Sequence, residues 1–168
     1  MSCKNGESCG CKSKAQTQVS LTQRLQEMGY ELPEVVAPLA SYVPAVCFGR
    51  TVHTSGQLPI RNGELVFKGK VNSAVSKEEA YECAKQCALN ALAAAARLVG
   101  GLDMINDVVK VTGFVNSESD FTEQPAVING ASDFFGELFG RGHARSAVGV
   151  AALPLDAPVE VEVIFSIR

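Results

Sequence analysis

Apolar and polar residues alternate most regularly near the C-terminus, between Arg145 and Arg168. The segment RSAVGVAAL breaks at Pro154 and the alternation resumes as VEVEVIFSIR. Such alternation is typical of a strand that buries one face, so the pattern predicts two half-buried strands. In the second strand three valines share one face and two glutamates share the other: Val159, Val161, Val163, Glu160 and Glu162.

Helical periodicity marks two long segments in the middle of the chain. The first opens with a capping box at Ser76–Glu79, continues to Leu98 and ends before Gly100. The second is predicted over 124–139 and contains Asn129-Gly130 in its middle, where glycine costs about 1 kcal/mol relative to alanine. That pair indicates close packing or a site. Small residues line one face of the first helix, which predicts packing against a sheet: Ala80, Cys83, Cys87, Ala91 and Ala94.

Shorter signals complete the predicted order of elements. A capping box at Ser20–Gln23 opens a short helix that Gly29 ends, and Asn62-Gly63 indicates a hairpin. Further strands are predicted at 45–48, 51–54, 64–67 and 108–115. The resulting order, β-β-β-α-β-α-β-β after the short helix, predicts a mixed α+β fold. We expect its two main helices on one face of a largely antiparallel sheet.

Length and charge narrow the class of protein. The 168 residues fit one domain and a tail, and we predict a flexible tail over 1–19 and a single domain over 20–168. A net charge of −3 and the absence of tryptophan disfavour nucleic-acid binding. No apolar run approaches the roughly 18 residues that span a membrane. Without a recognisable signal peptide, we expect a cytoplasmic protein.

The six cysteines fall into two groups. Cys47, Cys83 and Cys87 lie in predicted strands and helices, and we expect them in the core as small apolar groups. The other three, Cys3, Cys9 and Cys11, stand in the polar tail. They either belong to a disordered segment without a specific role, or they bind a soft metal or become oxidised. Three thiols with one C-x-C pair lack the paired spacing of a structural zinc site, so we expect no metal.

Few residues are candidates for chemistry. Arg145 stands at the head of a strand, where its fixed fork of donors suits a carboxylate, although a surface arginine is the commoner interpretation of such a position. Glu160 and Glu162 could serve acid–base chemistry if one of them lies near Arg145. Of the two histidines, His53 is predicted within a strand, and His143 could line the same cleft as Arg145. No nucleophile elbow or glycine-rich phosphate loop is present.

Several separated motifs resemble one family. The runs YVPAV, TSGQLP, GFVNS, VINGASDFF and HARSAVGVAALPLDAPVEVEVIF stand in the order found in the Rid (YjgF-type) family, the reactive-intermediate deaminases once called L-PSP endoribonucleases. The resemblance covers about residues 21–168 and is greatest to a longer branch with an extra N-terminal helix. It implies a chorismate mutase-like fold and a homotrimer with three clefts between subunits.

The resemblance also implies an activity and a site. Well-known members hydrolyse enamines or imines of 2-amino acids to 2-keto acids and ammonia without a cofactor. Arg145 matches the arginine that holds the substrate carboxylate, and Glu160 matches the glutamate that activates the hydrolytic water. Ala147 departs from the family, because many deaminases have cysteine there. The substrate-binding positions implied are Tyr42, Ser55, Gly56, Asn129, Arg145 and Ala147.

Alternative functions stay open at this point. The expected ligand is a small imino or keto carboxylate, which the chain either hydrolyses or only binds, as a ligand-sensing trimer. Ribonuclease activity, the older family label, is disfavoured by the acidic charge and the lack of a histidine pair.

Overall fold

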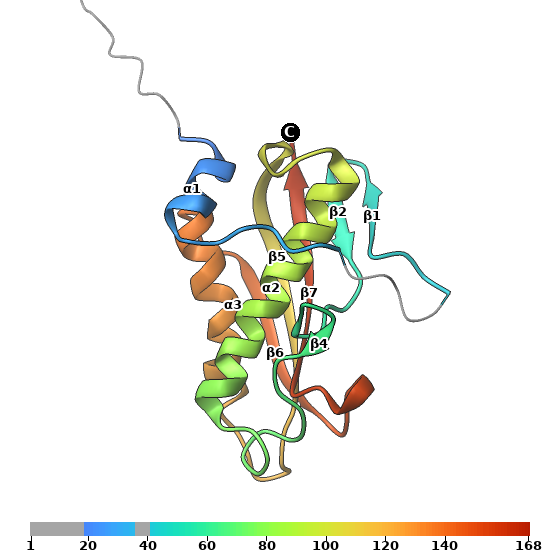
Figure 1. Cartoon of the computed structure of the whole chain (residues 1–168), viewed down its shortest axis with the longest axis vertical. Coiled ribbons are helices and arrows are strands. Elements are labelled where there is room, and N and C mark those ends of the chain that lie inside the picture. The colour runs from blue at the N-terminus through green and yellow to red at the C-terminus, as the bar shows by residue number, and fades with distance from the viewer. Residues whose placement is uncertain (1–18, 36–40) are drawn as a thin grey trace, which may run out of the picture.

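The computed structural model describes residues 19–35 and 41–168 (Figure 1). The tail cysteines Cys3, Cys9 and Cys11 lie outside the described residues. Within those residues, no helix is long and apolar enough to cross a membrane. The same part of the chain contains no group of three His, Cys, Asp or Glu side chains placed to hold a metal ion.

A five-stranded mixed sheet forms one layer of the molecule. Only the β5–β6 pair is parallel, and the three other pairs are antiparallel. This confirms the predicted largely antiparallel sheet, and the strand between 159 and 167 lies at its centre. In spatial order the strands are β1 (Ala45–Phe48), β2 (Thr51–Thr54), β7 (Val159–Ile167), β5 (Ile105–Asn116) and β6 (Ala144–Val150).

Two long helices, α2 (Lys77–Val99) and α3 (Gln124–Phe139), lie side by side over one face of this sheet (Figure 1). Ser76 and Glu79 form the predicted capping box, and α2 ends where Gly100 adopts a left-handed conformation with φ 86°. The helices approach closely at Gly130, because a Cβ there would overlap the backbone carbonyl of Tyr81. The poor helix former in the middle of α3 therefore has a packing role.

Smaller elements surround these two layers. The predicted N-terminal helix is α1 (Leu21–Glu27), and its Arg24 donates to the Leu138 carbonyl at the end of α3. The predicted hairpin is β3 (Ile60–Arg61) with β4 (Glu64–Leu65). Both of its turn residues have positive φ, 54° at Asn62 and 85° at Gly63, as a type I′ turn requires. Two short 3₁₀ segments complete the chain, at Leu102–Met104 and Pro154–Asp156.

The core lies between the sheet and the helices. As predicted, Val159, Val161 and Val163 face it, while Glu160 and Glu162 face away. Cys83 and Cys87 are fully buried, and burial raises the pKa of the Cys83 thiol to about 12, which makes it unreactive at neutral pH. The core is completed by the small residues of α2, including Ala80, Ala91 and Ala94.

The prediction that Cys47 lies in the core was wrong. Its side chain is exposed. The reason is the position of β1 as an edge strand, of which only the first residue, Ala45, is buried. Alternation along a short segment predicts a strand but does not show whether a helix covers it.

Candidate functional site

Arg145 lies at the start of β6 and points toward α3. Its Nη1 donates to Asn129 Oδ1 at 2.7 Å and to Ser132 Oγ at 3.1 Å. Both hydrogens of Nη1 are therefore used, and no acceptor among the described residues contacts Nε or Nη2. These two nitrogens form the edge of the guanidinium that binds a carboxylate through two parallel hydrogen bonds. The geometry thus favours the clamp over the surface arginine.

The sequence of α3 explains how its residues reach this arginine. Asn129 and Ser132 are three residues apart and share one helical face, whereas Gly130 lies against α2. On β6, Ala147 lies on the same strand face as Arg145, two residues on, and packs against the core. Asn129, Arg145 and Ala147 were predicted from the sequence as site residues, and the structure brings them together. Ser132 was not predicted.

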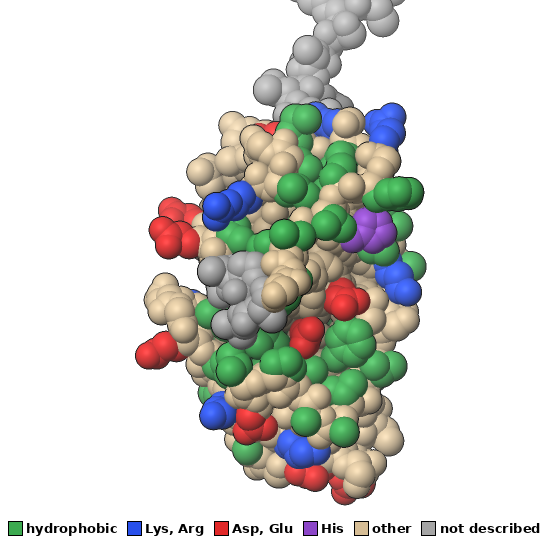
Figure 2. All heavy atoms as spheres, turned by 90° about the vertical axis from the view of Figure 1, so that its right-hand side faces the viewer, with side chains coloured by type: hydrophobic (Ala, Val, Ile, Leu, Met, Phe, Trp, Pro, Cys, Tyr) green, Lys and Arg blue, Asp and Glu red, His purple; other side chains and the backbone are tan. Residues whose placement is uncertain are grey.

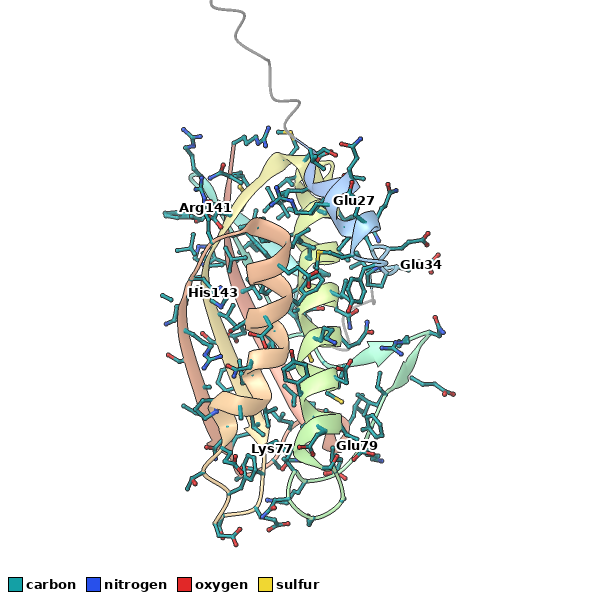
Figure 3. The ribbon with its side chains drawn as sticks, turned by 90° about the vertical axis from the view of Figure 1, so that its left-hand side faces the viewer. Glu27, Glu34, Lys77, Glu79, Arg141 and His143 are labelled. Atoms are coloured by element: carbon teal, nitrogen blue, oxygen red, sulfur yellow. The ribbon has the colours of Figure 1, made fainter. Side chains whose placement is uncertain are left out.

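His143 adjoins the same group, two residues before Arg145 on the segment that enters β6 (Figure 3). Its Nε2 lies 3.0 Å from Ser132 Oγ, and its ring stands edge-on to Phe135 with the centroids 6.3 Å apart. Burial and the nearby guanidinium of Arg145 lower the pKa of His143 below its usual value. The imidazole is therefore neutral at physiological pH.

A second group of predicted residues gathers around Glu160. The carboxylate of Glu160 lies so close to Gly56 that a Cβ at Gly56 would overlap it. The Ser55 hydroxyl donates to the Val43 carbonyl at 2.7 Å, which ties the segment carrying Tyr42 to this place. Tyr42 is exposed. Ser55, Gly56 and Glu160 therefore lie together, and Tyr42 precedes the residue that Ser55 contacts.

An irregularity in the sheet makes room for Glu160. His53 pairs with Ile164, but the next contact between the two chain segments is Gln57 with Val161, so the β2 side has one residue more than β7. The hydroxyl of Thr54 accepts the hydrogen bond of the Val163 N–H in between. This bulge carries Ser55 and Gly56 away from regular pairing and leaves the space that the carboxylate fills.

The environment of Glu160 favours the protonated form of its side chain. Burial raises the pKa of Glu160, and the neighbouring carboxylate of Glu162 raises it further. No residue of the described part of the chain donates a hydrogen bond to it. A carboxyl group with a raised pKa is a stronger base, once ionised, than an ordinary glutamate.

The two groups lie on opposite faces of the sheet. On β5, Val111 pairs with Arg145 and Phe114 pairs with Glu160. Residues an odd number apart along a regular strand point to opposite faces, so Arg145 faces the helices and Glu160 faces away from them. One chain does not bring Glu160 or Glu162 next to Arg145. His53 belongs to neither group, since its Nε2 contacts the Thr51 hydroxyl at 3.0 Å.

Comparison with known proteins identifies the family. The model of the YjgF/chorismate mutase-like endoribonuclease family matches residues 22–165. The chain belongs to the YjgF family. The fold class predicted from the motifs is therefore confirmed.

Two relatives in the YjgF family illustrate its range. Protein TCP17 of Trypanosoma cruzi is 43% identical over 148 residues, which cover 86% of this chain and 92% of that protein. A 2-iminobutanoate/2-iminopropanoate deaminase of Dermatophagoides farinae is 34% identical over 138 residues, covering 81% and 93% respectively.

Solved structures of YjgF-type proteins agree with the fold. The protein Atu1372 of Agrobacterium tumefaciens, whose function is unknown, has a TM-score of 0.79 and 40% identity, covering 88% of this chain and 92% of that one. The structure of Escherichia coli TdcF with bound serine has a TM-score of 0.54 and 29% identity, covering 81% and 92%.

Proposed function

We propose that this protein hydrolyses imines of 2-amino acids to 2-keto acids and ammonia, in clefts shared between copies of the chain. The observation that carries this proposal is the Nε–Nη2 edge of Arg145, which no acceptor of residues 19–35 and 41–168 contacts and which Asn129 and Ser132 hold in place. A relative named as an imine deaminase and a neighbour with bound serine support a small amino-acid-like ligand.

The separation of the two groups supports a shared site. Arg145 and Glu160 serve one substrate only if Arg145 of one copy meets Glu160 of another. Apolar side chains exposed beside the Glu160 group could pack against a second copy, since large exposed apolar patches mark interfaces. Hydrophobic side chains also interrupt the polar surface on the side that carries β1 and β2 (Figure 2). The exposed residues include Val43, Val46, Phe48 and Val148. A closed trimer, as the family resemblance implies, would form three such clefts.

The proposed reaction needs no strong nucleophile. Arg145 holds the substrate carboxylate, which fixes the neighbouring C=N carbon. Glu160 accepts a proton from a water as its oxygen adds to that carbon, the C=N electrons go to nitrogen, and Glu160 returns the proton to that nitrogen. When the C–N bond breaks, the hydroxyl proton passes to nitrogen, the hydroxyl oxygen becomes the keto oxygen and ammonia leaves. The raised pKa of Glu160 allows it to accept and return a proton at little cost.

A coupled assay tests the proposal. An amino-acid oxidase generates imines from several amino acids, and semicarbazide traps those that escape hydrolysis. We expect wild-type protein to lower semicarbazone formation and Arg145→Ala to abolish the effect. Arg97→Ala is the matched control, because Arg97 is exposed in the last turn of α2 and belongs to neither group. Equal activity of the wild type and Arg145→Ala would refute the proposal.

A ligand-sensing oligomer is the second candidate. It is favoured by Ala147, which stands where many deaminases have cysteine. Binding of a keto acid that depends on Arg145, with no hydrolysis of any imine, would establish this function. Ribonuclease activity gains no support from the site, because neither group contains a pair of histidines. The predicted cytoplasmic location stays a prediction.

A further inference from the structure

Three side chains form a continuous chain of hydrogen bonds behind the free edge of Arg145. Arg145 Nη1 lies 3.1 Å from Ser132 Oγ, and Ser132 Oγ lies 3.0 Å from His143 Nε2. They come from two elements, since Ser132 is on α3 while His143 and Arg145 stand at the entrance to β6. The Ser132 hydroxyl is the shared centre of the chain.

The chemistry of the three groups sets the direction of these bonds. A guanidinium has donors only, so the Ser132 oxygen accepts from Arg145. When the neutral ring of His143 carries its proton on Nδ1, its Nε2 is an acceptor, and the single hydrogen of the hydroxyl is then directed to it. Hydrogen bonds that run in one direction polarise and strengthen one another. A neutral His143 therefore favours the hydroxyl orientation that holds Arg145.

The surroundings of His143 disfavour a second proton on the ring. Its Nδ1, which carries the proton of the neutral ring in this arrangement, is buried and has no hydrogen-bond partner in the described part of the chain, so a second proton would go to Nε2, where the charge of Arg145 opposes it. The charged groups that face it are Arg145 from β6 and Asp107 from β5, and Asp107 is already paired with Arg141 at 3.3 Å. From α3 it meets the Phe135 ring and Ser132, neither of which carries charge.

We propose that Ser132 and His143 are positioning residues that fix the guanidinium of Arg145 with its Nε–Nη2 edge turned toward the ligand carboxylate. This inference rests on the proposed function, in which Arg145 binds that carboxylate. Protonation of His143 makes Nε2 a donor, so two cations then point at one hydroxyl oxygen and its hydrogen turns elsewhere. Carboxylate affinity therefore falls in acid more steeply than charge on the ligand alone explains.

The test measures binding of 2-oxobutanoate by titration calorimetry between about pH 5 and pH 8. Loss of one hydrogen bond to a charged group predicts about tenfold weaker binding for Ser132→Ala at the upper pH, and Ser132→Thr restores it. His143→Phe binds weakly at every pH. His143→Gln keeps an acceptor that does not titrate, so it binds well and loses the acid dependence.

The matched control is Thr22→Ala, which removes a hydroxyl that donates to Asp103 and takes no part in the Arg145 group. It retains the wild-type affinity and pH profile. A second readout does not depend on the ligand: the Arg145 Nε–H signal in ¹H–¹⁵N NMR is sharp in wild type and broadens in Ser132→Ala and in His143→Phe, because the guanidinium gains rotational freedom.

The outcomes separate this proposal from the proposed function. If Arg145→Ala binds 2-oxobutanoate as wild type does, or if the wild type does not bind it, the proposed function fails, and the NMR signal alone decides the positioning role. If Arg145→Ala loses binding while Ser132→Ala and His143→Phe keep it over the whole pH range, the positioning role is refuted and the function stands. An Arg145 signal unchanged by these variants also refutes it.

Discussion

The side chain of Arg145 is held by other side chains, whereas that of Glu160 is placed by the shape of the backbone. Asn129 and Ser132 accept hydrogen bonds from Nη1 of Arg145, and no acceptor in the described part of the chain contacts Nε or Nη2. Glu160 instead lies in a space that a sheet bulge and the absent side chain of Gly56 provide. The first arrangement fixes a permanent charge, and the second raises the pKa of a carboxyl group.

This difference matches the division of labour in the proposed reaction. A carboxylate clamp needs a rigid fork that stays charged, and a proton acceptor needs a pKa close to the working pH. Within one chain the two groups lie on opposite faces of the sheet, so the guanidinium of Arg145 does not lower the pKa of Glu160.

The largest expected effect comes from mixing the two regions between copies. Arg145→Ala and Glu160→Gln chains are each expected to be inactive alone. Unfolding and refolding them together would create clefts with an intact arginine from one chain and an intact glutamate from the other. If equal amounts of the two chains assemble at random into a closed ring, about a quarter of the clefts would contain both an intact Arg145 and an intact Glu160. The imine assay measures this recovery, and mixtures that stay inactive despite mixed assembly would refute a shared site.

Glu160→Gln alone is expected to lower kcat by about 100-fold to 10,000-fold, the usual contribution of a positioned acid–base group. The same substitution is expected to raise the stability of the folded protein at neutral pH, although it lowers kcat. Because the folded state raises the pKa of Glu160, its stabilising contribution is present below the unfolded value and is lost as pH rises through the folded value. At neutral pH the variant should therefore unfold at a slightly higher temperature than wild type. Glu162→Gln, on the same strand face, removes a carboxylate that helps to raise the pKa of Glu160 and is expected to lower activity far less.

Glycines support both regions, and substituting them should separate function from stability. At Gly130 a new Cβ would meet the backbone of α2 at Tyr81, so Gly130→Ala is expected to lower the free energy of unfolding by about 1 to 3 kcal/mol. Denaturant titration measures this loss. Gly136→Ala in the same helix is the control, since nothing lies near its Cβ position, and it should stabilise the helix slightly.

Gly56→Ala is the counterpart in the Glu160 region. There the new Cβ would meet the end of a flexible side chain, so the carboxylate moves aside while the backbone is retained. We expect turnover to fall about tenfold or more, because a small displacement of a catalytic group is costly. The unfolding free energy should change far less than in Gly130→Ala. A large loss of stability with unchanged turnover would contradict this view of Gly56.

Local patterns in the sequence predicted most of the helices and strands. They did not predict which side chains of different elements come into contact. The boxes that begin at Ser20 and Ser76 and the Asn62-Gly63 turn depend on neighbours within a few residues, so the pattern alone determines them. The registers of β6 and β7 against β5 determine that Arg145 and Glu160 point to opposite faces of the sheet. No local pattern in the sequence specifies these registers.

The candidate site shows the same limit. The resemblance supplied Arg145, Asn129 and Ala147, but Ser132 carries no motif of its own. Its one signal was the three-residue spacing from Asn129, which places both on one helical face. Cys47 was misplaced for a related reason, because coverage of an edge strand is a property of the whole fold.

The smallest expected effect concerns His143 and the pH dependence of stability. The folded state lowers its pKa, so below the unfolded value of about 6.5 the unfolded chain binds more protons than the folded chain. Stability should therefore decrease as pH falls from about 6.5 to the folded pKa and should not change on this account at higher pH. Comparing the unfolding temperatures of wild type and His143→Gln across this range measures the contribution. A difference that stays constant with pH would show that His143 titrates alike in both states, and the Arg145 region would then lack the acid sensitivity that distinguishes it from the Glu160 region.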